Sequence, residues 1–193
     1  MINKSDFAQL QEQLSSCDAV RDKLIIKSRE VVKLSKKIIY AVHLDQVHRA
    51  EKLRDQIKKE LETVQKLASS TPALQCSGSL TIAEQEFVEA ICFLEFVKNG
   101  TIPPHTQLKV DAESYLLGLC DLTGELLRNG INASIKENYA ETVRIKDVVS
   151  ELYGEFMQFE FRNGDLRRKF DSIKYALNKL EDVVLELKLK GKV

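Results

Sequence analysis

Apolar residues recur at alternating three- and four-residue steps along most of this chain, the spacing that places them on one face of an α-helix. The pattern predicts helices at residues 5–42, 44–68, 80–98, 110–128, 143–161 and 165–189. No segment shows the sustained alternation of apolar and polar residues that is typical of strands. We therefore expect an all-α fold, a bundle of about six helices that forms a single domain over residues 1–193.

The first predicted helix is long and amphipathic. Arg21, Ser28 and Ser35 are polar interruptions of its apolar face, which comprises Phe7, Leu10, Leu14, Cys17, Leu24, Val31, Ile38 and Val42. This pattern predicts packing against other helices along the length of the segment. Because this face and the aromatic fifth helix offer more apolar surface than one small bundle buries, we predict a large symmetric homo-oligomer.

Glycine, proline and asparagine mark the ends of the predicted helices. Asn99-Gly100 provides a left-handed stop after the third helix, and Pro103-Pro104 predicts an extended connector. Asn129-Gly130 closes the fourth helix, with room for one further turn. Residues 69–79 are expected to form a loop, and Asp165 is expected to cap the last helix.

The fourth predicted helix carries two carboxylates in otherwise apolar surroundings. Asp121 and Glu125 are four residues apart and share one helix face, while leucines cover nearly every other direction. Gly118 and Gly124 each cost about 1 kcal/mol relative to alanine, so we expect another part of the molecule to approach the backbone closely there. An ion pair at a helix–helix contact explains this stretch equally well when it is taken alone.

The third predicted helix has the same character, with Glu86 and Glu89 on one face among apolar residues. Converging carboxylates without matching basic partners repel one another unless divalent cations lie between them. Oxygen-only ligands favour Mg²⁺ or Mn²⁺ over Zn²⁺. The two helices are therefore expected to pack with these acidic faces together and to hold Mg²⁺ or Mn²⁺.

Other patterns exclude several classes of protein and site. No apolar run has the length needed to cross a bilayer and no secretory signal pattern follows Met1, so we expect a cytoplasmic protein without membrane association. Cys17, Cys76, Cys92 and Cys120 form no Cys-x-x-Cys pair and are expected to be reduced thiols. The sequence contains no His-Glu-x-x-His motif, no phosphate-binding glycine-rich loop and no Gly-x-Ser-x-Gly motif.

A net charge of zero conceals a strong asymmetry along the chain. Residues 21–66 hold 13 Lys/Arg and 7 Asp/Glu, residues 67–165 hold 7 and 15, and residues 166–193 hold 8 and 4. Basic outer segments with an acidic middle suit a protein that attracts a polyanion and holds cations at a separate site. A solvated helix face is the more usual reason for a run of charge, so the basic segments alone are weak evidence.

The acidic stretches resemble a known family. Residues 85–90, Gln-Glu-Phe-Val-Glu-Ala, and residues 115–126, Tyr-Leu-Leu-Gly-Leu-Cys-Asp-Leu-Thr-Gly-Glu-Leu, are similar to segments of translin-associated factor X. Residues 166–175 and 179–187 resemble translin itself. The likeness covers most of residues 80–193 and extends over the first 70 residues by pattern only.

The resemblance implies a helical subunit of the translin family, whose members assemble into hollow octameric shells. Because factor X subunits are metal-dependent endoribonucleases, it also implies that Glu86, Glu89, Asp121 and Glu125 are the catalytic, metal-binding residues. A single chain that combines both likenesses resembles a compact archaeal-type member. The implied protein is a homo-octamer that acts on single-stranded RNA with Mg²⁺ or Mn²⁺, and single-stranded DNA is a second candidate ligand.

One departure from the family pattern affects RNA binding. Translin has a basic, aromatic-rich stretch near the position of the acidic third helix, and this chain lacks it. We assign RNA binding instead to Arg21, Lys27, Lys33, Lys36, Lys37, Arg49, Arg54, Arg167, Arg168 and Lys169. Two alternatives stay open, a non-catalytic protein that binds single-stranded nucleic acid and a helical scaffold that binds protein.

Overall fold

The computed structural model describes residues 2–75 and 77–193. In order, its elements are α1 (Lys4–His43), α2 (Val47–Ser69), the 3₁₀ turn η1 (Pro72–Leu74), α3 (Gly78–Asn99), α4 (His105–Leu108), α5 (Ala112–Ile135), α6 (Tyr139–Phe156) and α7 (Asp165–Leu189). The expected all-α fold is confirmed. Over the described residues there are seven α-helices, not about six, because a short helix follows Pro104 inside the connector after α3.

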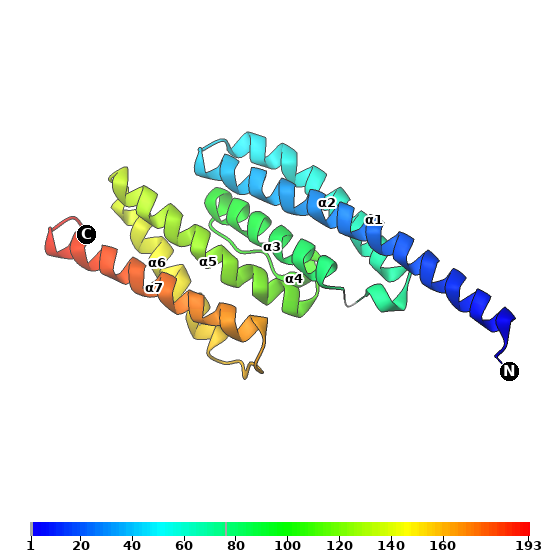
Figure 1. Cartoon of the computed structure of the whole chain (residues 1–193). Helices are drawn as coiled ribbons and strands as arrows, with labels where there is room; N and C mark the ends of the chain where they lie inside the picture. Colours follow the sequence, from blue (N-terminus) through cyan, green and yellow to red (C-terminus); the bar gives the residue numbers. More distant parts are fainter. Residues whose placement is uncertain (1, 76) are drawn as a thin grey trace.

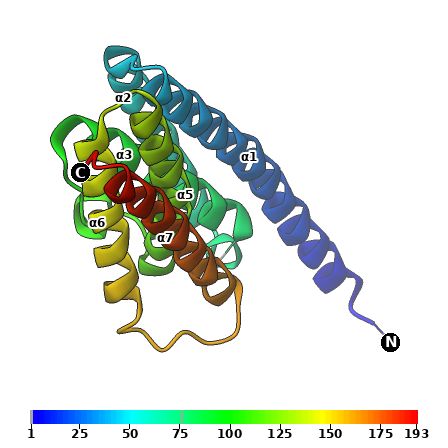
Figure 2. The same cartoon turned by 90° about the vertical axis from the view of Figure 1, so that its left-hand side faces the viewer.

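The helices form three successive pairs, with α3 and α5 in the middle (Figures 1 and 2). Helix α3 contacts α1, α2 and α5, and α5 contacts α3, α6 and α7. This central position explains why both segments are apolar on several sides, since a helix covered by neighbours on more than one side has no wide solvated face.

Helix α1 divides into two parts. Its C-terminal part packs on α2 and α3 and buries Leu24, Val31, Ile38 and Val42. Its N-terminal part extends past the bundle (Figures 1 and 2), and no residue of α1 before Leu24 is buried. The same apolar pattern therefore continues along an unpartnered end of the helix, where Phe7, Leu10 and Leu14 are 58%, 46% and 67% exposed.

Helix α5 does not end at Asn129-Gly130 as predicted; it continues to Ile135. Gly130 is buried against α7, and a Cβ added there would lie 2.7 Å from Leu180 Cδ2. Glycine at this position therefore permits close packing of α5 on α7 and is not a stop signal. The predicted stop at Gly100 is confirmed, since its φ of +71° is left-handed and its N–H bonds Phe96 O at 2.8 Å.

The boundaries of the last two helices also differ from the prediction. Helix α6 begins at Tyr139, because the Asn138 side chain accepts a hydrogen bond from Glu141 N, and it ends at Phe156. Phe161 lies in the following connector, where its ring packs against Phe156 and Phe170. The N-cap of α7 is Gly164, so the prediction of Asp165 as the cap is wrong; Asp165 lies in the first turn and pairs with Arg168.

The described residues also bear on two expectations, about membranes and about thiols. No helix among them is both apolar enough and long enough to span a membrane. Cys17, Cys92 and Cys120 are free thiols, and burial raises the pKa of Cys120 to about 12. Cys76 lies outside the described residues.

Candidate active site

The contact between α3 and α5 depends on Gly118. A Cβ added at Gly118 would lie 2.6 Å from Val88 Cβ and 2.7 Å from the backbone oxygen of Gln85, so a side chain would push the helices apart. The predicted close approach is therefore confirmed at Gly118. It is wrong at Gly124, where a Cβ would meet nothing within 4 Å because this glycine is exposed and lines an open cleft.

This cleft brings the predicted carboxylates together. It has a volume of about 610 Å³ and is lined by Glu86 and Glu89 of α3 and by Asp121 and Glu125 of α5. Helices α1 and α7 lie on either side of α3 and α5 (Figures 1 and 2) and supply further lining residues. The close approach at Gly118 sets the two acidic faces toward one space, as the sequence predicts.

Two of the carboxylates have basic partners that the sequence analysis did not foresee. Lys169 of α7 places its Nζ 2.6 Å from both carboxylate oxygens of Asp121. His43, at the end of α1, contacts Glu125 through Nε2, and Arg128 lies 3.9 Å from the same carboxylate. The expectation of four carboxylates without basic partners is therefore wrong for α5, because α1 and α7 bring basic side chains from distant parts of the sequence.

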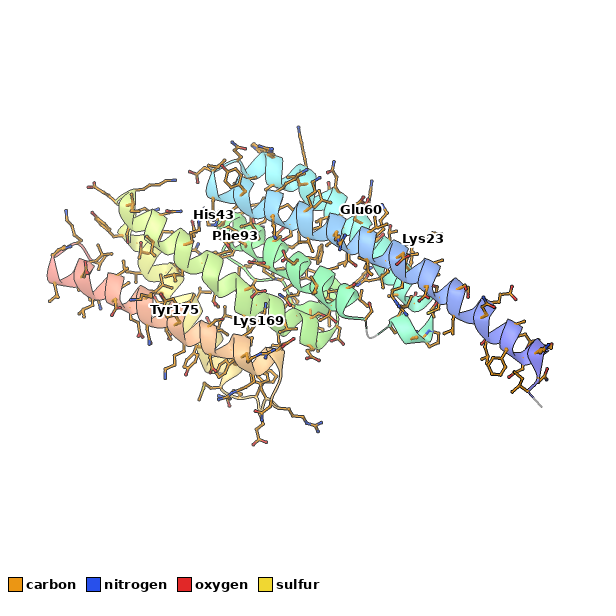
Figure 3. All side chains as sticks on the ribbon, in the orientation of Figure 1. Lys23, His43, Glu60, Phe93, Lys169 and Tyr175 are labelled. Atoms are coloured by element: carbon orange, nitrogen blue, oxygen red, sulfur yellow. The ribbon has the colours of Figure 1, made fainter. Side chains whose placement is uncertain are left out.

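The imidazole of His43 is held in a closed environment. Its side chain is 3% exposed, its ring lies 4.8 Å from that of Phe93 (Figure 3), and its Nδ1 is buried without a hydrogen-bond partner in the described structure. A ring packed in this way has little freedom to move, so it fixes the position of the Glu125 carboxylate.

The carboxylates of α3 are held differently. Glu86 accepts a hydrogen bond of 3.1 Å from Ser35 Oγ, a fully buried hydroxyl of α1. Glu89 makes no hydrogen bond within the described residues, and its pKa is raised to about 8. Burial is the main cause, and the negative charges of Asp121, Glu86 and Glu125 add to it while Lys169 opposes it. Glu89 is thus the group whose ionisation is least compensated.

This raised pKa predicts how the stability of the metal-free protein depends on pH. Between its unfolded value near 4.5 and its folded value near 8, Glu89 binds more protons in the folded state, so stability falls as pH rises through this window. The loss is on the order of a few kcal/mol. Thermal melts in EDTA from pH 5 to pH 9 should show this decline, and Glu89→Gln should flatten it.

A control variant separates this effect from general alkaline destabilisation. Glu151 lies on α6, is exposed and does not line the cleft, so Glu151→Gln should follow the pH profile of the unsubstituted protein. Parallel profiles for Glu89→Gln and Glu151→Gln would contradict the assignment of the raised pKa to Glu89.

The site residues suit a hard divalent cation by their chemistry. All four cleft carboxylates offer oxygen ligands. Glu89 makes no hydrogen bond or ion pair within the described residues, and the Lys169 ammonium beside Asp121 shows that positive charge is favoured in this cleft. In residues 2–75 and 77–193, however, no three His, Cys, Asp or Glu side chains are already arranged to hold a metal ion. Binding would therefore require these carboxylate side chains to turn toward one another.

Comparison with known proteins identifies the family. The model of the translin family matches residues 19–191, almost the entire described chain. The chain belongs to the translin family.

Its relatives include an archaeal protein, a translin and a translin-associated protein X homolog. An uncharacterized protein of Methanocaldococcus jannaschii is 30% identical over 169 residues, which cover 86% of this chain and 75% of that protein. Translin of Gallus gallus is 34% identical over 82 residues, 42% of this chain and only 36% of its own length. The translin-associated protein X homolog of Schizosaccharomyces pombe is 27% identical over 152 residues, 69% of this chain and 66% of that protein.

Solved structures share the fold over nearly the full length. Apo-NeC3PO superposes with a TM-score of 0.86 at 28% identity, covering 96% of this chain and 97% of its own. AfC3PO gives a TM-score of 0.88 at 25% identity, covering 96% and 98%. AfC3PO in complex with duplex RNA gives a TM-score of 0.83 at 24% identity, covering 96% of this chain and 97% of its own. At this identity the likeness shows the fold alone.

In this translin-family chain the basic candidates for RNA binding lie in several different settings. Lys33, Lys36 and Lys37 line a groove on the outer face of α1. Arg49 donates to Gln46, and the Arg167 guanidinium lies 5.6 Å from the centroid of Phe170. The others form ion pairs: Arg21 with Asp18, Lys27 with Glu30 and Glu60, Arg54 with Glu95, Arg168 with Asp165 and Lys169 with Asp121. Contact of these residues with RNA stays a prediction; among them Lys36 lines the cleft and Lys169 pairs with its carboxylate Asp121.

Several residues of this site were not among the predicted ones. Ser35 and His43 follow the buried face of α1, and Gln85 donates a hydrogen bond of 2.5 Å to Asp121. Ser35 did leave a signal in the sequence, since a polar residue on an otherwise apolar helix face needs a buried partner. His43 and Gln85 left none, because their partners Glu125 and Asp121 are distant in the sequence and only helix packing brings them together.

Proposed function

We propose that this protein is a metal-dependent endoribonuclease that acts on single-stranded RNA and uses Mg²⁺ or Mn²⁺. The observation that carries the proposal is the convergence of Glu86, Glu89, Asp121 and Glu125, from two helices, on one open cleft of about 610 Å³. Membership of the translin family and the likeness to the S. pombe factor X homolog support it.

In this proposal the four carboxylates would hold the cation, which would supply an activated water and neutralise charge on the attacked phosphodiester. Ser35 and His43 keep Glu86 and Glu125 in place, because both are buried and packed. Glu89, whose pKa is raised to about 8 mainly by burial, would have to be ionised to act as a ligand. Lys169, which pairs with Asp121 in this structure, would be a basic side chain able to contact a phosphate oxygen of the substrate.

A second candidate function is binding of single-stranded nucleic acid without cleavage. The pairing of Asp121 with Lys169 and of Glu125 with His43 favours it, because both carboxylates are already compensated by protein side chains. Basic residues along α1 would hold the strand in either case, since phosphate contacts require no chemistry at the cleft.

One experiment separates the two functions. End-labelled single-stranded RNA is incubated with the pure protein in Mg²⁺ and in EDTA, beside a duplex of the same sequence. The proposal expects internal cleavage of the single strand only with Mg²⁺. Binding without cleavage in Mg²⁺ and Mn²⁺ would select the second function, and cleavage of the duplex at an equal rate would correct the substrate class.

We further expect the protein to assemble as a homo-octamer, with the N-terminal part of α1 as one interface. Phe7, Leu10 and Leu14 are exposed on one face of that part and have no neighbours from the described bundle to cover them. Light scattering should therefore report a particle of about eight 22.0 kDa chains. Replacing the three residues by serine should yield smaller species.

The matched control for assembly replaces polar residues of the same exposed helix. Gln9 and Gln13 lie between the apolar positions, so Gln9→Ser with Gln13→Ser should leave the particle size unchanged. A 22.0 kDa monomer at micromolar concentration would contradict the assembly prediction.

A further inference from the structure

Each side wall of the cleft carries one exposed tyrosine. Tyr40 on α1 is 59% exposed and Tyr175 on α7 is 62% exposed, and both line the same cleft as the four carboxylates. Figure 3 shows Tyr175 on the same helix as Lys169. Neither tyrosine is needed to position a carboxylate, because Ser35, His43, Gln85 and Lys169 already do so.

Both rings have surface available for a ligand. Tyr40 makes no aromatic or cation–π contact within the described residues, while Tyr175 has only the Lys179 ammonium at 6.0 Å from its centroid. A tyrosine ring is a large apolar surface with a polar end, and leaving most of it in water forgoes the stabilisation that burial would give. An exposed aromatic on either side of a polar cleft is therefore suited to contact a flat, partly apolar ligand.

The cleft continues into a basic groove on α1. This groove has a volume of about 460 Å³ and is lined by Arg29, Val32, Lys33, Lys36, Lys37 and Tyr40. Lys36 and Tyr40 line both the groove and the cleft, so the two spaces meet at these residues. A polyanion lying along α1 would therefore be led past Tyr40 to the carboxylates.

The arrangement of two aromatic rings and a basic groove beside a cleft suits the chemistry of a nucleic acid strand. Aromatic side chains stack on unpaired bases of any identity, while Lys and Arg neutralise the phosphates between them. A base inside a duplex has both of its faces covered by neighbouring bases and cannot use such a ring.

We propose that Tyr40 and Tyr175 form a base-stacking subsite that holds unpaired nucleotides at the cleft while the α1 groove holds the adjoining phosphates. The substrate class, RNA, rests on the proposed function; the stacking itself does not depend on cleavage. The subsite selects single strands over duplexes by requiring a base whose face is free, and it is indifferent to which base is present.

Binding measurements with intact and abasic strands test this subsite. The probe is a fluorescently labelled single-stranded RNA, in EDTA to prevent cleavage, compared with the same strand lacking its bases at the central positions. Tyr40→Ala and Tyr175→Ala should each weaken binding of the intact strand by about 5- to 150-fold. Tyr→Phe at either position should retain affinity, because the ring and not the hydroxyl is required.

The abasic strand supplies the decisive comparison. It should bind the unsubstituted protein as weakly as the intact strand binds the Tyr40→Ala/Tyr175→Ala double variant. The alanine substitutions should not weaken its binding any further. Lys36→Ala should weaken both strands equally and should lower the salt dependence of binding, by about 0.7 in the logarithmic slope for each phosphate that the protein no longer neutralises. Tyr139→Ala, at a tyrosine that does not line the cleft, should change nothing.

Three results would overturn the inference. They are alanine variants that keep full affinity for the intact strand, an equal fall in affinity for intact and abasic strands, and a change of particle size in light scattering that places the tyrosines in a subunit contact. Failure of the unsubstituted protein to bind the strand also counts against it. Tyrosine-dependent binding without cleavage in Mg²⁺ would support the subsite and refute the nuclease, and cleavage without tyrosine dependence would do the reverse.

Discussion

Replacing Glu125 by Gln is expected to lower Mg²⁺-dependent cleavage of single-stranded RNA by at least about 100-fold, because even partners one shell beyond a metal ligand contribute about 10- to 100-fold. The substitution keeps the shape of the side chain and a hydrogen-bond acceptor for His43 Nε2. It removes one negative charge from the cleft, so a cation held there would lose an anionic ligand and the phosphodiester would lose charge neutralisation. RNA affinity in EDTA should be unchanged or slightly higher, since the basic groove lies on α1.

Melting temperature and cleavage rate are measured on the same sample of this variant. In the binding-only alternative Glu125 merely compensates His43 and Arg128, so its substitution would lower stability and leave the behaviour toward RNA as it was. Glu151→Gln, on the exposed side of α6, controls for the loss of a glutamate as such. A Glu125→Gln protein that melts lower and cleaves at the original rate would refute the catalytic assignment.

The acidic pairs could be predicted because the information lies within single helices. The spacing of Glu86 from Glu89 and of Asp121 from Glu125 fixes each pair on one face, whatever the rest of the chain does. Their apolar surroundings indicate that both helices are central, and α3 and α5 are indeed the middle pair. Because α3 and α5 pack against each other in the middle of the bundle, their acidic faces line one shared cleft.

The partners of the carboxylates could not be predicted in this way. Lys169 is 48 residues from Asp121 and His43 is 82 residues from Glu125, so only the packing of α7 and α1 brings them together. Lys169 illustrates the difficulty, because its sequence neighbours Arg167 and Arg168 made it one member of a basic run. In the structure it lies at the carboxylates, with 33% of its side chain exposed, while Arg167 and Arg168 remain on the surface.

Glycines show the same limit on a smaller scale. A helical glycine in the sequence indicates that something about its position is special, but it does not say what. Gly118 allows α3 to approach closely, and Gly130 allows α7 to do so. Gly124 has no neighbour within reach of a Cβ and faces the open cleft. The prediction that Gly130 ends a helix was wrong, because glycine is favoured both at helix ends and where two helices pack closely, and the sequence does not distinguish these cases.

Gly118→Ala is expected to be the most damaging small substitution on α5. The new Cβ would lie 2.6 Å from Val88 Cβ and 2.7 Å from Gln85 O, and neither a Cβ nor a backbone oxygen in the middle of α3 can turn aside. Relief requires the helices to separate, and such overpacking costs about 1–3 kcal/mol. For a chain of this size the melting temperature should fall by about 2–12 °C.

Gly124→Ala is the matched control, six residues further along the same helix and beside the same carboxylates. A Cβ there meets nothing within 4 Å, so the substitution should stabilise the protein by about 0.5–1 kcal/mol through helix propensity alone. Opposite signs of the two changes in melting temperature would show that the α3–α5 contact is tight at Gly118.

The cleavage rate extends the test to the site. A shift of α3 against α5 moves Glu86 and Glu89 relative to Asp121 and Glu125, and displacements near 1 Å cost about 100-fold in rate. Gly118→Ala should therefore be both less stable and slower per folded molecule. A Gly118→Ala protein as stable and as active as Gly124→Ala would mean that the two acidic faces are not held in place by this contact.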